Sequence, residues 1–403
     1  MPFALRRKLV LVTTAAVPAV LLRLLGHGPA PVELLVYGSA IVVASFLLAW
    51  AAEAAQVDIS GGLAIAILAL IAVLPEYAID LYFAYTAGHD PAYTSYAAAN
   101  MTGSNRLLLG LGWPLVAFVT LRALSRKQGR PVRELVLAPR RRVELAFLGV
   151  AAALAFVMPA TRQIHLALAI VLLLLFAGYL WRVARGGVTE PELIGTPKRI
   201  AELPRRPRRI TVAGLFVIAA VVVLASAEPF AHALIGTGTQ LGVDRFLLVQ
   251  WLAPLASEAP EFIVAILLAR RGNGDDAMGT LLSSKVNQWT LLVGSIPLAY
   301  MLGGGGASLP LDSRQVEEVL LTATQTALGF AVLVQLRFHL GAAAALLALF
   351  VVQFALPGTT ARLVISGIYA GLALFILTRR YFARRRSVVQ VRAEVLQSAV
   401  ARE

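Results

Sequence analysis

The chain has 403 residues, of which 59% are apolar and only 14% are charged. Soluble domains carry about 25% charged residues, so this composition excludes an ordinary soluble enzyme and a disordered chain. A disulfide scaffold is excluded because the chain has no cysteine. The formal net charge is +14, from 36 Lys and Arg against 22 Asp and Glu. In a membrane protein, basic loops on the cytoplasmic side explain such an excess, and these loops also meet anionic lipid. We therefore expect no nucleic-acid partner.

Apolar stretches long enough to cross about 30 Å of hydrocarbon recur along the whole chain. They predict an all-α polytopic membrane protein with about twelve transmembrane helices, at approximately 9–25, 32–54, 62–86, 92–121, 142–159, 163–184, 210–232, 243–270, 276–302, 315–336, 340–356 and 361–379. If the N-terminus is cytoplasmic, 29 of the 36 basic residues fall at cytoplasmic segments or helix ends. The positive-inside rule therefore predicts a multi-pass protein of the plasma (cell inner) membrane with both termini in the cytoplasm.

A linker rich in Pro, Gly and Arg, residues 185–209, separates two halves that resemble each other. The shared landmarks are Asp58, Pro75-Glu76 and Gly103-Ser104-Asn105 in the first half, and Asp244, Pro260-Glu261 and Ser283-Ser284-Lys285 in the second. The two Pro-Glu spans run in opposite directions, which indicates an inverted repeat with a site near the midplane. We expect an N-terminal segment with an extra helix (1–31), a first five-helix repeat (32–184), the basic linker (185–209), a second five-helix repeat (210–356), and an extra helix with a basic cytoplasmic tail (357–403).

Ionisable side chains inside the expected spans indicate function, because they are costly in a membrane. Pro75 is expected to kink its helix and free a backbone carbonyl near Glu76. Asp80 lies four residues after Glu76 on the same helix face, and Glu258 and Glu261 also share a face, with Ser257 beside them. The next span of each half adds a polar stripe, formed by Asn100 and Ser104 and by Thr280, Ser284 and either Asn287 or Gln288. Hard cations select such clusters of carboxylate, hydroxyl and carbonyl oxygens.

These motifs resemble the cation/calcium exchanger superfamily, which includes sodium/calcium and proton/calcium exchangers. Its two inverted repeats each carry a Pro-Glu on one helix and a Gly-Ser-Asn-like segment on the next, and the resemblance covers roughly residues 32–356. The resemblance implies a secondary antiporter rather than an enzyme, with no permanently bound cofactor. Such an antiporter moves a cation, in the first place Ca²⁺, in exchange for Na⁺ or H⁺ by alternating access. Carried over residue by residue, the resemblance implies the cation-binding residues Glu76, Glu261, Asn100, Ser104, Asn105, Ser257 and Ser284.

Two basic residues depart from the family pattern. Lys285 stands where the family has Asn or Asp, and Arg106 directly follows the first Gly-Ser-Asn segment. Together with Glu258 and Asp80 they are expected to tune the charge of the site. Two alternatives to calcium exchange follow: a monovalent cation/proton (Na⁺/H⁺) antiporter on the same fold, and a non-transporting membrane scaffold or sensor whose site is closed by Lys285.

Overall fold

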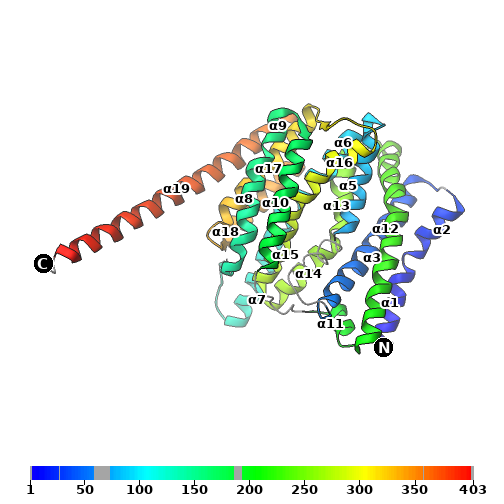
Figure 1. Cartoon of the computed structure of the whole chain (residues 1–403), viewed down its shortest axis with the longest axis horizontal. Helices are drawn as coiled ribbons and strands as arrows, with labels where there is room; N and C mark the ends of the chain where they lie inside the picture. Colours follow the sequence, from blue (N-terminus) through cyan, green and yellow to red (C-terminus); the bar gives the residue numbers. More distant parts are fainter. Residues whose placement is uncertain (1, 27, 59–72, 186–192, 357, 401–403) are drawn as a thin grey trace.

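The computed structural model describes residues 2–26, 28–58, 73–185, 193–356 and 358–400, with residues 383–400 as backbone only (Figure 1). The helices before the linker are α1 (Phe3–Thr14), α2 (Val17–Leu25), α3 (Ala30–Ala55), α5 (Leu74–Ala87), η1 (Pro91–Tyr93), α6 (Thr94–Leu107), η2 (Leu108–Gly112), α7 (Trp113–Gln128), η3 (Pro139–Arg141), α8 (Arg142–Ala155), α9 (Val157–Thr161) and α10 (Leu166–Ala184). The later ones are α11 (Thr196–Ala201), α12 (Arg205–Leu241), α13 (Arg245–Ser257), α14 (Ala259–Arg271), α15 (Gly274–Asn287), η4 (Gln288–Leu292), α16 (Val293–Leu302), α17 (Ser313–Leu333), α18 (Leu340–Ala355) and α19 (Thr359–Val400). Four short strands complete the described chain: β1 (Glu134–Val136), β2 (Gln163–His165), β3 (Ser308–Pro310) and β4 (Arg337–His339).

The helices confirm an all-α polytopic membrane fold. Within the described residues, seven helices are long and apolar enough to span a membrane, and the bent pair α13–α14 makes an eighth. The first expected span, 9–25, is divided between α1 and α2, and α18 is shorter than a full span. Part of the expected span 62–86 lies outside the described residues. The number of twelve spans therefore stays a prediction.

The internal repeat has a counterpart in the backbone. In each half one long helix passes through a π-helical turn, α6–η2–α7 in the first and α15–η4–α16 in the second. Arg162 and Leu336, at φ 56° and 61°, are the non-glycine residues with left-handed backbone among those described, and they directly precede β2 and β4. β1 pairs with β4 and β2 with β3, both antiparallel. Each ribbon thus takes one strand from each half, as a pseudo-two-fold arrangement requires.

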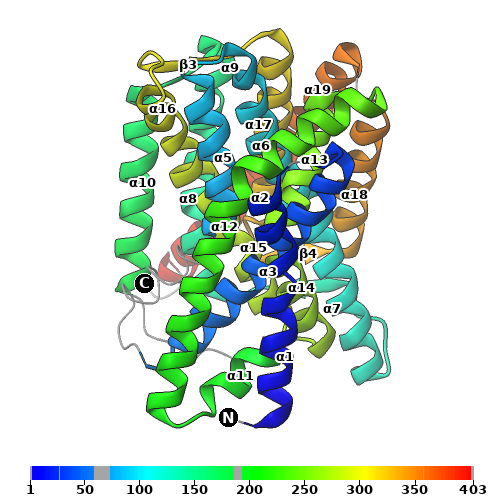
Figure 2. The ribbon, with the colours of Figure 1, turned by 90° about the vertical axis from the view of Figure 1, so that its right-hand side faces the viewer.

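Close contacts between helices of the two halves position the interior. α3 and α12 lie side by side along one flank of the bundle, beside α1 and α2 (Figures 1 and 2). Further in, α6 crosses α13 so closely that a Cβ atom on Gly103 would collide with the backbone carbonyl of Gln250. Small residues at membrane helix crossings permit such an approach. The contact brings the polar stripe of the first half against the broken span of the second.

An ion-pair clasp joins the end of α3 to the start of α12. Arg208 donates from Nε to Oδ2 of Asp58 at 2.7 Å and from Nη2 to Oδ1 at 2.8 Å. The hydrogen bonds from Arg208 lower the pKa of Asp58 to about 2. The clasp therefore fastens the first long helix of one half to the first long helix of the other.

This clasp predicts a pH-dependent contribution to stability. Because the folded-state pKa of Asp58 lies below its unfolded value of about 3.9, the contribution is fully present above that value and is lost as the pH falls toward 2. We expect Asp58→Asn to lower Tm at pH 7, with the difference from wild type shrinking below pH of about 4. Thermal unfolding in detergent across this pH range measures it, with the exposed Glu202→Gln as control. Equal Tm values of Asp58→Asn and wild type at pH 7 would contradict the clasp.

Candidate cation site

The site is built where helices begin inside the bundle. Glu258 joins α13 to α14, whose axes differ by 56°, and Pro260 lies in the first turn of α14. Proline suits a helix start because its fixed φ fits and its missing N–H has no partner there. α5 begins at Leu74, which places Glu76 in its first turn, as Glu261 is placed in that of α14. The expected kink at Pro75 involves residues 59–72, which lie outside the described residues. Helix N-termini favour negative charge, so both glutamates occupy favourable positions.

Gln288 links carboxylates of the two halves. Its Nε2 donates to Oε1 of Glu76 at 3.1 Å and to Oε1 of Glu258 at 2.7 Å. All three side chains are buried, and Gln288 is the first residue of the π-helical turn η4. The sequence assigned direct binding to Glu76 and Glu261 and only a tuning role to Glu258. In the structure Gln288, which the sequence indicated only as one option in the polar stripe, joins Glu76 to Glu258. Glu261 also lies close enough to Glu76 for the two charges to interact.

Buried oxygen atoms without a hydrogen-bond partner gather among the predicted site residues. Near the site these atoms are Oδ1 and Oδ2 of Asp80, Oδ1 of Asn100, Oγ of Ser104, Oδ1 of Asn105, Oε2 of Glu258, Oε2 of Glu261 and Oε1 of Gln288, and further such oxygen atoms of the described residues lie elsewhere. Leaving such acceptors unpaired in a membrane interior is costly, and carboxylate, amide and hydroxyl oxygens are the ligands of hard cations. No three His, Cys, Asp or Glu side chains of the described residues are grouped to hold a metal ion. Any cation bound here would therefore also need the neutral oxygens.

Other predicted residues are held within their own helices. Ser257 donates its hydroxyl to the carbonyl of Ala253 at 3.1 Å, and Asn105 donates Nδ2 to the carbonyl of Met101 at 3.0 Å. Ser284 is buried on α15. These bonds orient the side chains and leave their oxygen lone pairs available to a ligand.

One carboxylate near the site was missed by the sequence analysis. Glu53, on α3, lies close enough to Glu261 for the two charges to interact. It stands at the end of the expected span 32–54, where a charged residue is ordinarily read as interfacial. Only the packing of α14 against α3 brings it toward the site.

Lys285 is fully buried but does not bridge the carboxylates. Its Nζ donates to the backbone carbonyl of Asn105 at 2.5 Å and lies 5.7 Å from the centre of the Trp289 ring. The position between Glu76 and Glu258 is taken by the uncharged Gln288. The ammonium therefore ties α15 to α6 and adds positive charge beside the pair.

Arg106 belongs to a separate, balanced charge cluster. Its Nη2 lies 2.6 Å from Oε2 of Glu318, whose Oε1 pairs with Nη1 of Arg362 at 3.1 Å. Arg362 also pairs through Nε with Glu317 at 3.3 Å, so two arginines face two glutamates and the formal charges cancel. From the sequence we expected Arg106 to offset part of the negative charge of the cation site. In the structure Arg106 pairs with Glu318, and Lys285 is the basic residue that lies close to Glu258 and Glu76.

A polar side chain connects this cluster with the helix that carries the predicted ligands. Gln250 donates from Nε2 to Oε2 of Glu318 at 3.2 Å and to Oγ1 of Thr102 at 3.1 Å. Thr102 lies on α6 between Asn100 and Ser104. Arg362 lies on α19, so the last helix is fastened through the cluster to the helix of the site.

Comparisons with known proteins bear on the same residues. The family model described as sodium/calcium exchanger protein matches residues 30–184 and 211–357. The crystal structure of the H⁺/Ca²⁺ exchanger CAX is similar, with 42% sequence identity, a TM-score of 0.88 and coverage of 96% of each chain. No curated protein sequence matches the chain.

Two more distant structures share the fold. Native YfkE has 18% identity and a TM-score of 0.62, over 91% of this chain and 99% of that one. The sodium-calcium exchanger NCX_Mj has 19% identity and a TM-score of 0.52, over 85% of this chain and 99% of that one. At these identities the likeness supports the architecture and carries no statement about the ion.

The balanced cluster predicts that substitution of a buried glutamate lowers the stability of the protein much more than substitution of an exposed one. Glu318→Gln would leave Arg106 and Arg362 with too little countercharge, and breaking a buried pair costs about 3–5 kcal/mol. Glu228→Gln removes the exposed pair with Arg23, which is worth about 0–1 kcal/mol. We expect a much lower Tm for Glu318→Gln, measured by thermal unfolding of purified protein.

Glu318→Asp keeps the negative charge, so we expect its Tm to lie between those of Glu318→Gln and wild type. It also remains informative if Glu318→Gln does not accumulate in the membrane. If Glu318→Gln and Glu228→Gln lowered Tm equally, the cluster would not hold the helices together as described.

Proposed function

The chain belongs to the sodium/calcium exchanger family, and from this premise we propose that it is a secondary antiporter that exchanges Ca²⁺ for H⁺. The family comprises transporters rather than enzymes, as the sequence led us to expect. The proposal of Ca²⁺ and H⁺ in particular is supported by the 42% identity with an H⁺/Ca²⁺ exchanger over 96% of the chain. It is supported independently by the chemistry of the Glu76–Gln288–Glu258 bridge.

The bridge is the single observation that carries the proposal. Two buried carboxylates from opposite halves face one uncharged amide, which donates hydrogen bonds but supplies no charge. A divalent cation as substrate would balance both carboxylates. Once that cation has left, two bare carboxylates would be very costly in a membrane interior, so protons must replace it. Cation and protons then exclude one another at the same oxygens, and that exclusion is the requirement for exchange.

The remaining site residues take supporting roles in this proposal. Glu261 and Asp80 would add negative charge next to the bridge, while Asn100, Ser104, Asn105, Ser257 and Ser284 would supply neutral oxygens. Lys285 would offset part of the acidic charge while its Nζ remains bound to Asn105. Displacement of the flank helices α3 and α12 relative to the bundle would open the site to either side in turn. We place the chain in the plasma membrane with both termini in the cytoplasm, on the basis of its basic segments.

Flux measurements in proteoliposomes test the proposal. We expect Ca²⁺ uptake driven by an outward proton gradient, and a loss of at least about tenfold for Glu76→Gln or Glu258→Gln, because even outer-sphere changes cost 10–100-fold in metal affinity. Glu261→Gln should reduce uptake less if Glu258 is the direct partner of Glu76. Glu228→Gln, an exposed glutamate far from the bridge in sequence, is the control.

The same assay separates the alternatives. Uptake driven by a Na⁺ gradient but not by a proton gradient would point to Na⁺ as the counter-ion. Na⁺/H⁺ exchange without Ca²⁺ movement would favour the monovalent antiporter. Absence of flux under every gradient, restored by Lys285→Asn, would favour a scaffold closed by Lys285. Unchanged flux in both Glu76→Gln and Glu258→Gln would contradict the site.

A further inference from the structure

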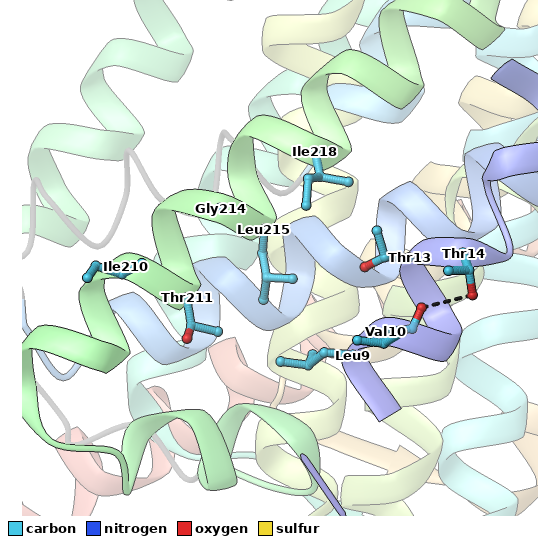
Figure 3. A pocket seen from close by; sticks show the side chains of 9 residues that line it. All are labelled: Leu9, Val10, Thr13, Thr14, Ile210, Thr211, Gly214, Leu215 and Ile218. Carbon is cyan, nitrogen blue, oxygen red and sulfur yellow. Dashed lines mark hydrogen bonds between the residues drawn. The ribbon is translucent and has the colours of Figure 1, made fainter. Parts of the chain in front are cut away.

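A groove between α1 and α12 lies on the flank of the bundle, away from the cation site. It has a volume of about 300 Å³ and is lined by Leu9, Val10, Thr13, Thr14, Ile210, Thr211, Gly214, Leu215 and Ile218. Figure 3 shows Leu215 and Ile218 of α12 on the side that faces Leu9 and Thr13 of α1. The hydroxyl of Thr14 donates to the carbonyl of Val10 at 2.9 Å, so it is satisfied within its helix. The groove therefore presents a predominantly apolar wall.

Gly214 is one of the residues that line the groove. A Cβ atom built on Gly214 would meet no heavy atom within 4 Å, although the residue lies between α12 and α1. A larger residue there would fill the space. Both helices start at the end of the molecule that carries the N-terminus and α11 and run in the same direction from it (Figure 2). The lining residues Leu9 and Ile210 are thus the ones nearest to the starts of the two helices.

Basic residues stand at that end on the faces that line the groove. Arg6 precedes Val10 by four residues, and Arg206 precedes Ile210 by four, so each lies one helical turn below a lining residue. Helical side chains lean toward the N-terminus of their helix, so both arginines lie on the N-terminal side of the lining residues. Arg7 adds a third charge next to Arg6.

These three arginines differ from their neighbours in having no described side-chain partner. Arg208 and Arg209 are bound to Asp58, at 2.7 and 3.3 Å. Lys8 donates to Thr196 at 2.7 Å and lies over the ring of Trp50. Arg6, Arg7 and Arg206 are exposed, and no other described side chain forms a hydrogen bond or ion pair with them.

We propose that the groove binds a phospholipid with an anionic head group. One acyl chain lies along the apolar wall past Gly214, and the phosphate is held between Arg6 and Arg206. The occupant is a lipid because the groove is apolar along α12, a helix long and apolar enough to span a membrane, and arginines with no described side-chain partner precede its lining residues on the side expected to be cytoplasmic. Arginine is well suited to phosphate because its planar fork donates two parallel hydrogen bonds.

The bound lipid would attach α1 to α12. Residues 1–29, which include α1, lie outside the part of the chain that the family model matches. α12 is also the helix clasped to α3 through Asp58 and Arg208. A lipid between α1 and α12 would thus stabilise one flank of the bundle and make its stability depend on the anionic lipid content. This inference depends on the membrane fold alone and is independent of which ions are exchanged.

Native mass spectrometry of delipidated full-length protein tests the site. The protein is titrated with dioleoylphosphatidylglycerol and, separately, with dioleoylphosphatidylcholine, which has the same acyl chains. We expect the anionic lipid to bind more tightly, and Arg6→Gln/Arg206→Gln to weaken its binding about 30-fold, from the loss of two basic residues near a lipid head group. Gly214→Leu should weaken it by filling the groove.

Matched controls are available elsewhere on the surface. Arg126→Gln/Arg270→Gln removes two exposed arginines from other helices, and Gly371→Leu enlarges a glycine with open surroundings on α19. Both should bind lipid like wild type. Equal binding of the two lipids to wild type, or equal effects of Gly214→Leu and Gly371→Leu, would overturn the proposal. A dimer that disappears in Gly214→Leu would also overturn it, because the occupant would then be a second copy of the chain.

Discussion

The uncharged amide of Gln288 holds together carboxylates that belong to opposite halves of the molecule, Glu76 at 3.1 Å and Glu258 at 2.7 Å. Other features of the interior can be understood through this contact. The bend between α13 and α14 places Glu258 there, and the close approach of α6 and α13 at Gly103 brings the polar stripe of the first half nearby. Lys285 is bound to a backbone carbonyl and so does not displace the amide.

The buried charges divide into two groups with different consequences. Arg106 and Arg362 face Glu317 and Glu318, so this cluster is neutral and acts as a fastening between α6, α17 and α19. In the second group Lys285 lies near Glu258 and Glu76, with Glu261 and Asp80 close to Glu76, so this group has an excess of acidic side chains among the described residues. Because a membrane interior penalises such an imbalance, the proposed function has either a cation or protons balance it. Because the neutral cluster is separate from the site, changes of charge at the site in the proposed exchange leave the ion pairs between α6, α17 and α19 in place.

The sequence predicted more of the helical architecture than of the contacts between individual buried side chains. The two Pro-Glu motifs and the direction of their spans indicated an inverted repeat, and π-helical turns and ribbon strands recur at matching places in the two halves. It could not show that Gln288 would join Glu76 to Glu258, because that contact depends on how the bent pair α13–α14 packs against the other half. The partner of Arg106 was equally hidden, since Glu318 is brought beside it only when α17 packs on α6.

The most direct test of this account is the number of protons released when Ca²⁺ binds. Titration calorimetry of the purified protein in buffers of different ionisation enthalpy measures it at equilibrium, without a requirement for transport. The account predicts that Ca²⁺ binding to wild type releases protons and that Glu258→Gln releases one fewer, with weaker binding. Ca²⁺ binding without proton release, or an unchanged proton count in Glu258→Gln, would contradict the bridge as the place where cation and protons compete.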